Sequence, residues 1–188
     1  MKRQDVLAEL VGGVWHTTNQ DRFLRILEYG AILPEPDIPE RERWGTAVAS
    51  EGYPYVRSIG GVSLFDLRGF ESESYSAEYR SSSWEYFVPC HLSWDSAVWI
   101  EIDHEALGPA FVSGVELLGR WKAEGSFRRI MPLIEGAHTG PLPCRAFKKA
   151  FSVRREPEDP HSLAAVLKAG RLKPRPCVSV PLSHPYTC

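Results

Sequence analysis

Residues 14–33 read VWHTTNQDRFLRILEYGAIL and carry a complete strand, helix and strand pattern. The first four residues have strand character, and Thr18 or Asn19 can accept hydrogen bonds from the free amides at a helix start. The apolar positions of that helix, three and four residues apart, are Phe23, Ile26 and Leu27. Gly30 is a typical helix stop, and a short apolar strand follows it. The pattern therefore delivers His16 on a strand, directly before a helix begins.

Strands outnumber helices in the rest of the chain. We expect a helix over residues 3–11 and a polar, Pro-rich loop over 34–45. The expected strands cover residues 47–50, 59–66, 84–90, 96–103, 130–136 and 150–153. Residues 67–83 suit an exposed excursion or an irregular helix, and 111–123 fit either helix or strand. Because strands and helices do not alternate steadily, the pattern favours an α+β fold over a doubly wound parallel sheet.

The chain length fits one domain. A chain of 188 residues buries about 70% of its unfolded surface, so its core needs no metal or disulfide. We place the domain at residues 1–170, with a last helix over 158–170. Residues 171–188 are rich in proline and are expected to run over the surface as a tail.

Composition argues against a strong global electrostatic field. Lys+Arg number 22 and Asp+Glu number 24, for a net charge of −2, so nothing in the total attracts nucleic acid or an acidic membrane. Two local basic clusters are present, and the ordinary interpretation of each is a solvated face. Their members are Arg120, Lys122, Arg128 and Arg129 in one, and Arg145, Lys148 and Lys149 in the other.

Cysteine spacing and hydropathy indicate a cytoplasmic protein. The four cysteines form no CxxC pair, so we expect reduced thiols, two of them in the core. No run of 18 apolar residues occurs, and no membrane partner is expected. The first residues, MKRQDVLAELVGG, lack the apolar segment of a secretory signal.

Two segments contain residues suited to chemistry. His16 lies at a strand end beside helix-start amides, a setting that favours polar or anionic ligands. Glu135 follows an apolar run and precedes a Gly/Pro turn, and a carboxylate among apolar residues is costly without partners. Each has a structural alternative: a histidine that only satisfies local hydrogen bonds, and a glutamate on the solvent side of an edge strand.

Together the two segments resemble a known family. The string H-T-T-N-x-x-x-F-L-x-I-L-x-x-G-x-I-x-P, from His16, is similar to the opening of ADP-ribosyltransferase-like proteins, most of all the DarT-type DNA ADP-ribosyltransferases. The string P-L-I-E-G-A-H-T-G-P-L-P-x-x-x-F-K-K-A-F-x-V resembles the segment that holds their catalytic glutamate. The resemblance spans residues 14–153 and is sharp only at its two ends. It implies two packed, mostly antiparallel sheets with short helices, and NAD as co-substrate.

The resemblance also implies roles for single residues. His16 would bind the adenosine-side ribose of NAD, with Thr17 or Thr18 fixing the dinucleotide. Arg57 would pair with the NAD phosphates or polarise an acceptor, its alternative being an ordinary surface arginine. Ser63 would be the small polar group on the middle strand. The aromatic candidates for stacking on nicotinamide are Tyr75, Tyr79 and Tyr86, of which Tyr86 is favoured.

The resemblance gives Glu135 the central role. A carboxylate beside the ribose 2′-hydroxyl stabilises the oxocarbenium-like charge formed when nicotinamide leaves, and it can act as a general base on an acceptor. The acceptor would be a macromolecule, DNA, RNA or protein, as for a toxin or phage-defence factor, and a toxin would have an antitoxin partner. The family's polar and aromatic DNA loop has no clean counterpart, because residues 67–83 are acidic as well as serine-rich.

Other functions compete with this interpretation. One is a catalytically silent nucleotide- or partner-binding module on the same fold, and another is NAD hydrolysis. Whether His16 and Glu135 face one cleft discriminates the enzyme from the silent module. A metal-dependent hydrolase would use His16, His91, His104 and His138, but these lack the usual ligand spacings. Ser-His-Asp chemistry is weaker still, because no GxSxG string is present.

Overall fold

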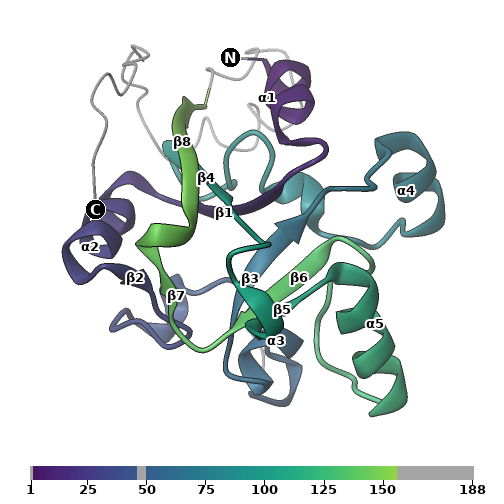
Figure 1. Cartoon of the computed structure of the whole chain (residues 1–188). Helices are drawn as coiled ribbons and strands as arrows, with labels where there is room; N and C mark the ends of the chain where they lie inside the picture. Colours follow the sequence, from purple (N-terminus) through teal and green to yellow (C-terminus); the bar gives the residue numbers. More distant parts are fainter. Residues whose placement is uncertain (1, 46–49, 156–188) are drawn as a thin grey trace.

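The computed structural model describes residues 2–45 and 50–155, which form an α+β structure around one antiparallel sheet (Figure 1). Six strands lie in the order β5-β6-β3-β1-β4-β8, and every pair in this order is antiparallel. A separate two-stranded sheet joins β2 and β7. The expected α+β class is confirmed.

The bounds of the elements follow the chain. The helices are α1 (Arg3–Leu10), α2 (Gln20–Tyr29), α3 (Tyr55–Ser58), α4 (Ser72–Glu78) and α5 (Gly114–Ala123). The strands are β1 (Val14–Thr18), β2 (Ala31–Ile32), β3 (Gly61–Asp66), β4 (Ser96–Ile102), β5 (Phe111–Val112), β6 (Glu135–Thr139), β7 (Leu142–Pro143) and β8 (Phe147–Arg154). Short 3₁₀ turns occupy Glu40–Glu42, Ser50–Gly52, Trp84–Tyr86, Gly108–Ala110 and Cys144–Ala146.

The opening strand, helix and strand form as the local pattern predicts. Asn19 is the N-cap of α2, and its side chain accepts a 2.9 Å hydrogen bond from the Arg22 amide. Gly30 ends the helix with a φ of 81°, in the left-handed region where a side chain is unfavourable. The chain thereby turns from β1 through α2 into β2 within 20 residues, bringing the helix start close to the sheet.

Apolar side chains pack on both faces of the sheet. One face is covered by α1, α4 and residues 84–94, around Trp15 and Trp99. The opposite face is covered by α2 and the small β2–β7 sheet, around residues such as Leu64 and Ile100. A third cluster packs α3 and α5 against β5 and β6. Because both faces are covered, β4 is buried at nearly every position instead of alternating between core and solvent.

Two expected strands are wrong in part or entirely. Residues 84–90 form a 3₁₀ turn and an irregular segment. Trp84, Phe87 and Val88 are all buried, and the neighbours Phe87 and Val88 would point to opposite faces of a strand. Residues 130 and 131 are irregular, 132–134 form a turn, and β6 begins only at Glu135. Pro132 cannot donate a backbone hydrogen bond, and Leu133 adopts a φ of 63°, so the strand cannot extend back through them.

The remaining expectations have mixed outcomes. Residues 111–123 contain both alternatives, with β5 followed directly by α5. The segment 67–83 includes α4 but is not merely exposed, since Phe70 and Tyr75 are buried.

Ser50 starts a 3₁₀ turn, and the rest of the strand expected at 47–50 lies outside the described residues, as do the helix at 158–170 and the tail. Among the described residues, no helix is both long and apolar enough to cross a membrane.

Candidate functional site

A cavity opens where β1 and β3 separate. These strands pair only through Val14 with Asp66 and Trp15 with Phe65, after which β1 continues alongside β4. The cavity has a volume of about 1010 Å³, at the upper end of the range of roughly 300–1,000 Å³ typical of small-molecule pockets. The sheet contributes to its wall His16, Thr17, Thr18, Gly61, Val62, Ser63, Phe65 and Glu135.

Glu135 is completely buried at the start of β6. One carboxylate oxygen accepts a 2.8 Å hydrogen bond from the Ser63 hydroxyl, and the other accepts a 2.9 Å bond from the Met131 amide. Burial raises the pKa of Glu135 to about 7, and the two hydrogen bonds oppose this effect without cancelling it. The carboxyl group is therefore poised to gain or lose a proton near neutral pH.

A tight turn before β6 holds this carboxylate. The Glu135 amide donates to the Met131 carbonyl at 2.9 Å, while Leu133 between them occupies the left-handed region with φ 63°. Such a conformation in a branched residue costs on the order of 1–3 kcal/mol and persists where surrounding packing enforces it. Gly114 of α5 supplies that packing, because a Cβ there would lie 1.8 Å from the Leu133 carbonyl oxygen.

His16 is connected to Glu135 through Ser63. The His16 Nδ1 lies 3.0 Å from the Ser63 carbonyl oxygen, so Nδ1 carries the proton and Nε2 stays free to accept. Burial lowers the pKa of His16, which favours the neutral ring. Strand alternation alone would put His16 and Glu135 on opposite faces, since their partners Ile100 and Phe65 belong to opposite cores. Both nevertheless line one cavity, beside the point where the pairing of β1 with β3 ends.

The two threonines also lie on the cavity wall. Thr18 is buried, and the Thr17 hydroxyl oxygen is buried without a hydrogen-bond partner among the described residues. An unpaired buried hydroxyl is costly, and such groups are uncommon away from sites that receive a ligand or water. The structure thus brings His16, Thr17, Thr18, Ser63 and Glu135 together.

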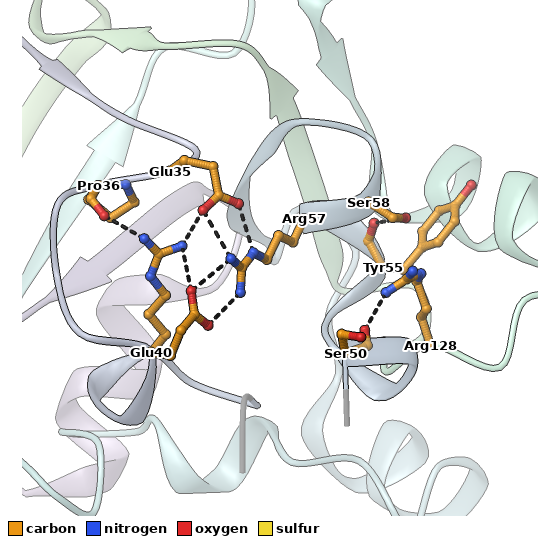
Figure 2. A network of polar contacts seen from close by, with 9 residues as sticks. Glu35, Pro36, Glu40, Ser50, Tyr55, Arg57, Ser58 and Arg128 are labelled. Carbon is orange, nitrogen blue, oxygen red and sulfur yellow. Dashed lines mark hydrogen bonds and ion pairs between the residues drawn. The ribbon is translucent and has the colours of Figure 1, made fainter. Parts of the chain in front are cut away.

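Arg57 lines the cavity from α3, with its guanidinium already engaged (Figure 2). Its Nε and Nη2 donate to Glu35 at 2.7 and 3.1 Å, and its Nη1 and Nη2 donate to Glu40 at 2.8 Å each. The Tyr53 ring lies 4.8 Å from the guanidinium carbon. Arg57 is therefore more than an ordinary surface arginine, yet its donors are directed to carboxylates of the protein.

Tyr86 lies elsewhere. Its side chain is 53% exposed, and it is not among the described residues that line the cavity. Tyr75 is buried and hydrogen-bonded to Ser82, and Tyr79 packs on Tyr75. In this structure none of the three tyrosines is a wall of the cavity.

A different aromatic wall replaces them, and the sequence interpretation missed it. Phe87 packs on Phe65, Trp44 and His91, with ring centroids 5.0–5.4 Å apart, and His91 packs on Trp94 at 5.1 Å. All five rings line the cavity. The only local signal was the density of aromatic residues in FVPCHLSW, and that signal cannot distinguish a cavity wall from a core.

Three further arginines line the cavity and were also missed. They are Arg22 on α2 and, on the loop between β2 and α3, Arg41 and Arg43. Arg22 donates to the Glu42 carbonyl at 3.1 Å and to its carboxylate at 3.3 Å. With Arg57 they bring four guanidinium groups to the cavity, among the carboxylates of Glu35, Glu40 and Glu42. Guanidinium groups suit an anionic ligand where a carboxylate gives way to it.

Histidines do not gather into a metal site in the part of the chain that the structure describes. No group of three or more His, Cys, Asp or Glu there is arranged to hold a metal ion. His91 Nδ1 contacts the Ser93 hydroxyl at 2.8 Å, His104 packs on Phe111, and His138 Nδ1 contacts the Gly140 carbonyl at 3.1 Å.

Comparison of the chain with protein-family models, with curated proteins and with solved structures finds no match in any of the three.

Proposed function

We propose that this protein is an NAD-dependent ADP-ribosyltransferase that transfers ADP-ribose to a macromolecule. One observation carries the proposal: Ser63 contacts both His16 and the buried Glu135 on the wall of a cavity of about 1010 Å³. The arginines and the unpaired Thr17 hydroxyl favour a ligand with phosphates and sugar hydroxyls. The aromatic wall offers flat surfaces for rings.

In the proposed reaction the bond between nicotinamide and ribose C1′ breaks, and nicotinamide leaves with the electron pair. Glu135, as carboxylate, lies beside the positively charged ribose and stabilises it in a site from which water is largely excluded. A nucleophilic oxygen or nitrogen of the acceptor then bonds to C1′, and its proton passes to Glu135. A pKa of about 7 suits both roles, because the carboxylate is available at neutral pH and remains basic enough to take a proton.

Neutral His16 holds the substrate in this scheme. Its Nδ1–H is fixed by the Ser63 carbonyl, which leaves Nε2 to accept a hydrogen bond from a ribose hydroxyl. Ser63 thus positions the binding residue with its carbonyl and the carboxylate with its hydroxyl.

The decisive substitution is Glu135→Gln. Its amide oxygen can still accept from the Met131 amide and its NH₂ can donate to the Ser63 hydroxyl, so the fold is kept while the charge is lost. We expect nicotinamide release from NAD to fall by about 100-fold or more, as for removal of one stabilising group. The matched control is Glu116→Gln, the same change on an exposed residue of α5.

The assay incubates wild-type protein and variants with NAD labelled in its adenylate part, then scores free nicotinamide, labelled DNA, RNA and protein, and free ADP-ribose. Labelled macromolecule from wild type and not from Glu135→Gln supports the proposal. Free ADP-ribose alone would identify an NAD hydrolase. Turnover retained in Glu135→Gln would remove the assigned mechanism, and no turnover in wild type would favour the silent binding module.

A further inference from the structure

Residues 33–45, which follow β2, cover one side of the cavity and are held by ion pairs. The cavity-lining residues of this segment include Ile38, Arg43 and Trp44. Arg57 binds Glu35 and Glu40 of this segment (Figure 2). Arg43 binds Glu35 and the Pro36 carbonyl and lies 3.6 Å from Glu40. Arg22 binds Glu42. The loop is therefore fastened to α2 and α3 by charged groups at the cavity edge.

Both binding edges of the Arg57 guanidinium are occupied. A guanidinium binds carboxylate or phosphate through two parallel N–H donors, either Nε with Nη2 or Nη1 with Nη2. Glu35 takes the first edge and Glu40 the second. The opposite charge raises the pKa of Arg57 and lowers those of Glu35 and Glu40. A ligand phosphate can reach either edge of Arg57 only if a carboxylate leaves it.

Displacing these carboxylates from Arg57 costs little solvation free energy. Their side chains are 52% and 48% exposed, so each returns to water with little change in solvation, whereas the Arg57 side chain is 26% exposed. Water screens ion pairs at this exposure more strongly than it screens buried ones. A ligand with two adjacent anionic groups can replace both carboxylates, while a single anionic group replaces one and leaves the other on Arg57.

We propose that Glu35 and Glu40 compete with ligand phosphates for Arg57: they occupy it in the free protein and exchange with a ligand diphosphate. The inference rests on the proposed function in that a dinucleotide supplies the diphosphate. The carboxylates act by competition: a ligand with one phosphate must displace one of them, and a diphosphate that binds both edges of Arg57 must displace both.

The test measures binding of inorganic pyrophosphate and orthophosphate by calorimetry, using the full chain. In Glu35→Gln/Glu40→Gln the neutral amides compete weakly, so pyrophosphate affinity should rise about tenfold. Orthophosphate affinity should rise less, because orthophosphate competes with only one of the two carboxylates, so the preference for pyrophosphate should increase. Adding Arg57→Gln to the pair should abolish both gains. The matched control, Glu9→Gln/Glu116→Gln, removes the same charge from two half-exposed ion pairs that do not line the cavity.

Unchanged or weaker pyrophosphate binding in the double variant would overturn the proposal, because it would make the ion pairs purely structural supports of the loop. If the double variant does not fold, Glu40→Gln alone frees one edge and must give a smaller gain in the same direction. Pyrophosphate binding does not require NAD cleavage. If pyrophosphate affinity rises in an Arg57-dependent way but NAD is not cleaved, the exchange at Arg57 is supported and the enzyme proposal fails. If NAD is cleaved but pyrophosphate affinity does not rise, the enzyme proposal stands and the exchange fails.

Discussion

The Glu135 carboxylate is completely buried and accepts only two hydrogen bonds, and this combination raises its pKa. A buried carboxylate that accepted more donors would stay ionised at low pH and be a poor base. Here burial outweighs the Ser63 hydroxyl and the Met131 amide, which brings the pKa to about 7. The burial that makes this carboxyl group titrate near neutral pH therefore also lowers the free energy of unfolding at that pH.

That cost predicts a pH-dependent stability change in Glu135→Gln. The folded pKa of about 7 lies above the ordinary 4.5, so the unfolded chain ionises first as pH rises. In wild type, protonated Glu135 therefore makes its full contribution to stability below pH 4.5. The free energy of unfolding falls by on the order of 3 kcal/mol between that pH and just above pH 7. Gln carries no charge, so the Tm of the variant minus that of wild type should increase across this window. A difference that stays constant with pH in thermal unfolding would contradict the assignment.

Ser63 should tune the same titration. Its hydroxyl donates to the ionised form of Glu135, so Ser63→Ala should raise the pKa of the carboxyl further. Because the proposed reaction needs the carboxylate, the pH at which kcat is half-maximal should move upward in the variant. Ser93→Ala, on the same cavity wall but bonded to His91, is the control. An unmoved midpoint would show that Ser63 does not act through Glu135.

Helix α5 positions the carboxylate without containing any of the proposed site residues. Gly114, its first residue, lies against the Leu133 carbonyl, and its amide donates to Asp66 at 3.0 Å. Asp66 in turn binds Arg68, and the Asp66 amide donates to the Ile134 carbonyl at 2.7 Å. The end of β3, the turn before β6 and the start of α5 are therefore joined into one rigid support.

Two glycines of α5 make a matched test of this support. In Gly114→Ala the new methyl group would lie 1.8 Å from the Leu133 oxygen, so the turn must move, and we expect a loss of roughly 1–3 kcal/mol together with reduced turnover. Gly119→Ala meets nothing within 4 Å and should stabilise α5 by about 0.5–1 kcal/mol, with turnover unchanged. Urea unfolding and the nicotinamide assay measure both effects. Equal behaviour of the two variants would mean that the turn does not depend on α5.

Across the whole molecule, the separation of β1 from β3 creates the site. Here pairing stops after Trp15 and Phe65, and the aromatic wall, the arginines and the loop of residues 33–45 surround the opening. Within the basic clusters noted in the sequence, Arg120 pairs with Glu116 and Lys149 with Glu9. The cavity arginines Arg22, Arg43 and Arg57 are likewise paired with glutamates.

Features that depend on neighbouring residues could be predicted from the chain alone. The Asn19 cap, the stop at Gly30, helix α1 and strands β1, β3 and β4 follow from hydrogen bonding, sterics and side-chain periodicity over a few residues. Two of the four cysteines, Cys90 and Cys144, are buried as free thiols, as expected. His16, Ser63 and Glu135 were identified as candidates from short motifs and a family resemblance, without any measure of how they meet.

Tertiary structure alone decided how the candidates are used. Ser63 joins groups 47 and 72 residues away, and Glu35 and Glu40 capture Arg57 from 22 and 17 residues away. Trp44, Phe87 and Trp94 became a cavity wall, whereas Tyr86 did not. The physical reason is the range of the forces involved: backbone geometry responds to adjacent residues, while burial, pKa and cavity shape depend on segments that meet only after the chain has folded.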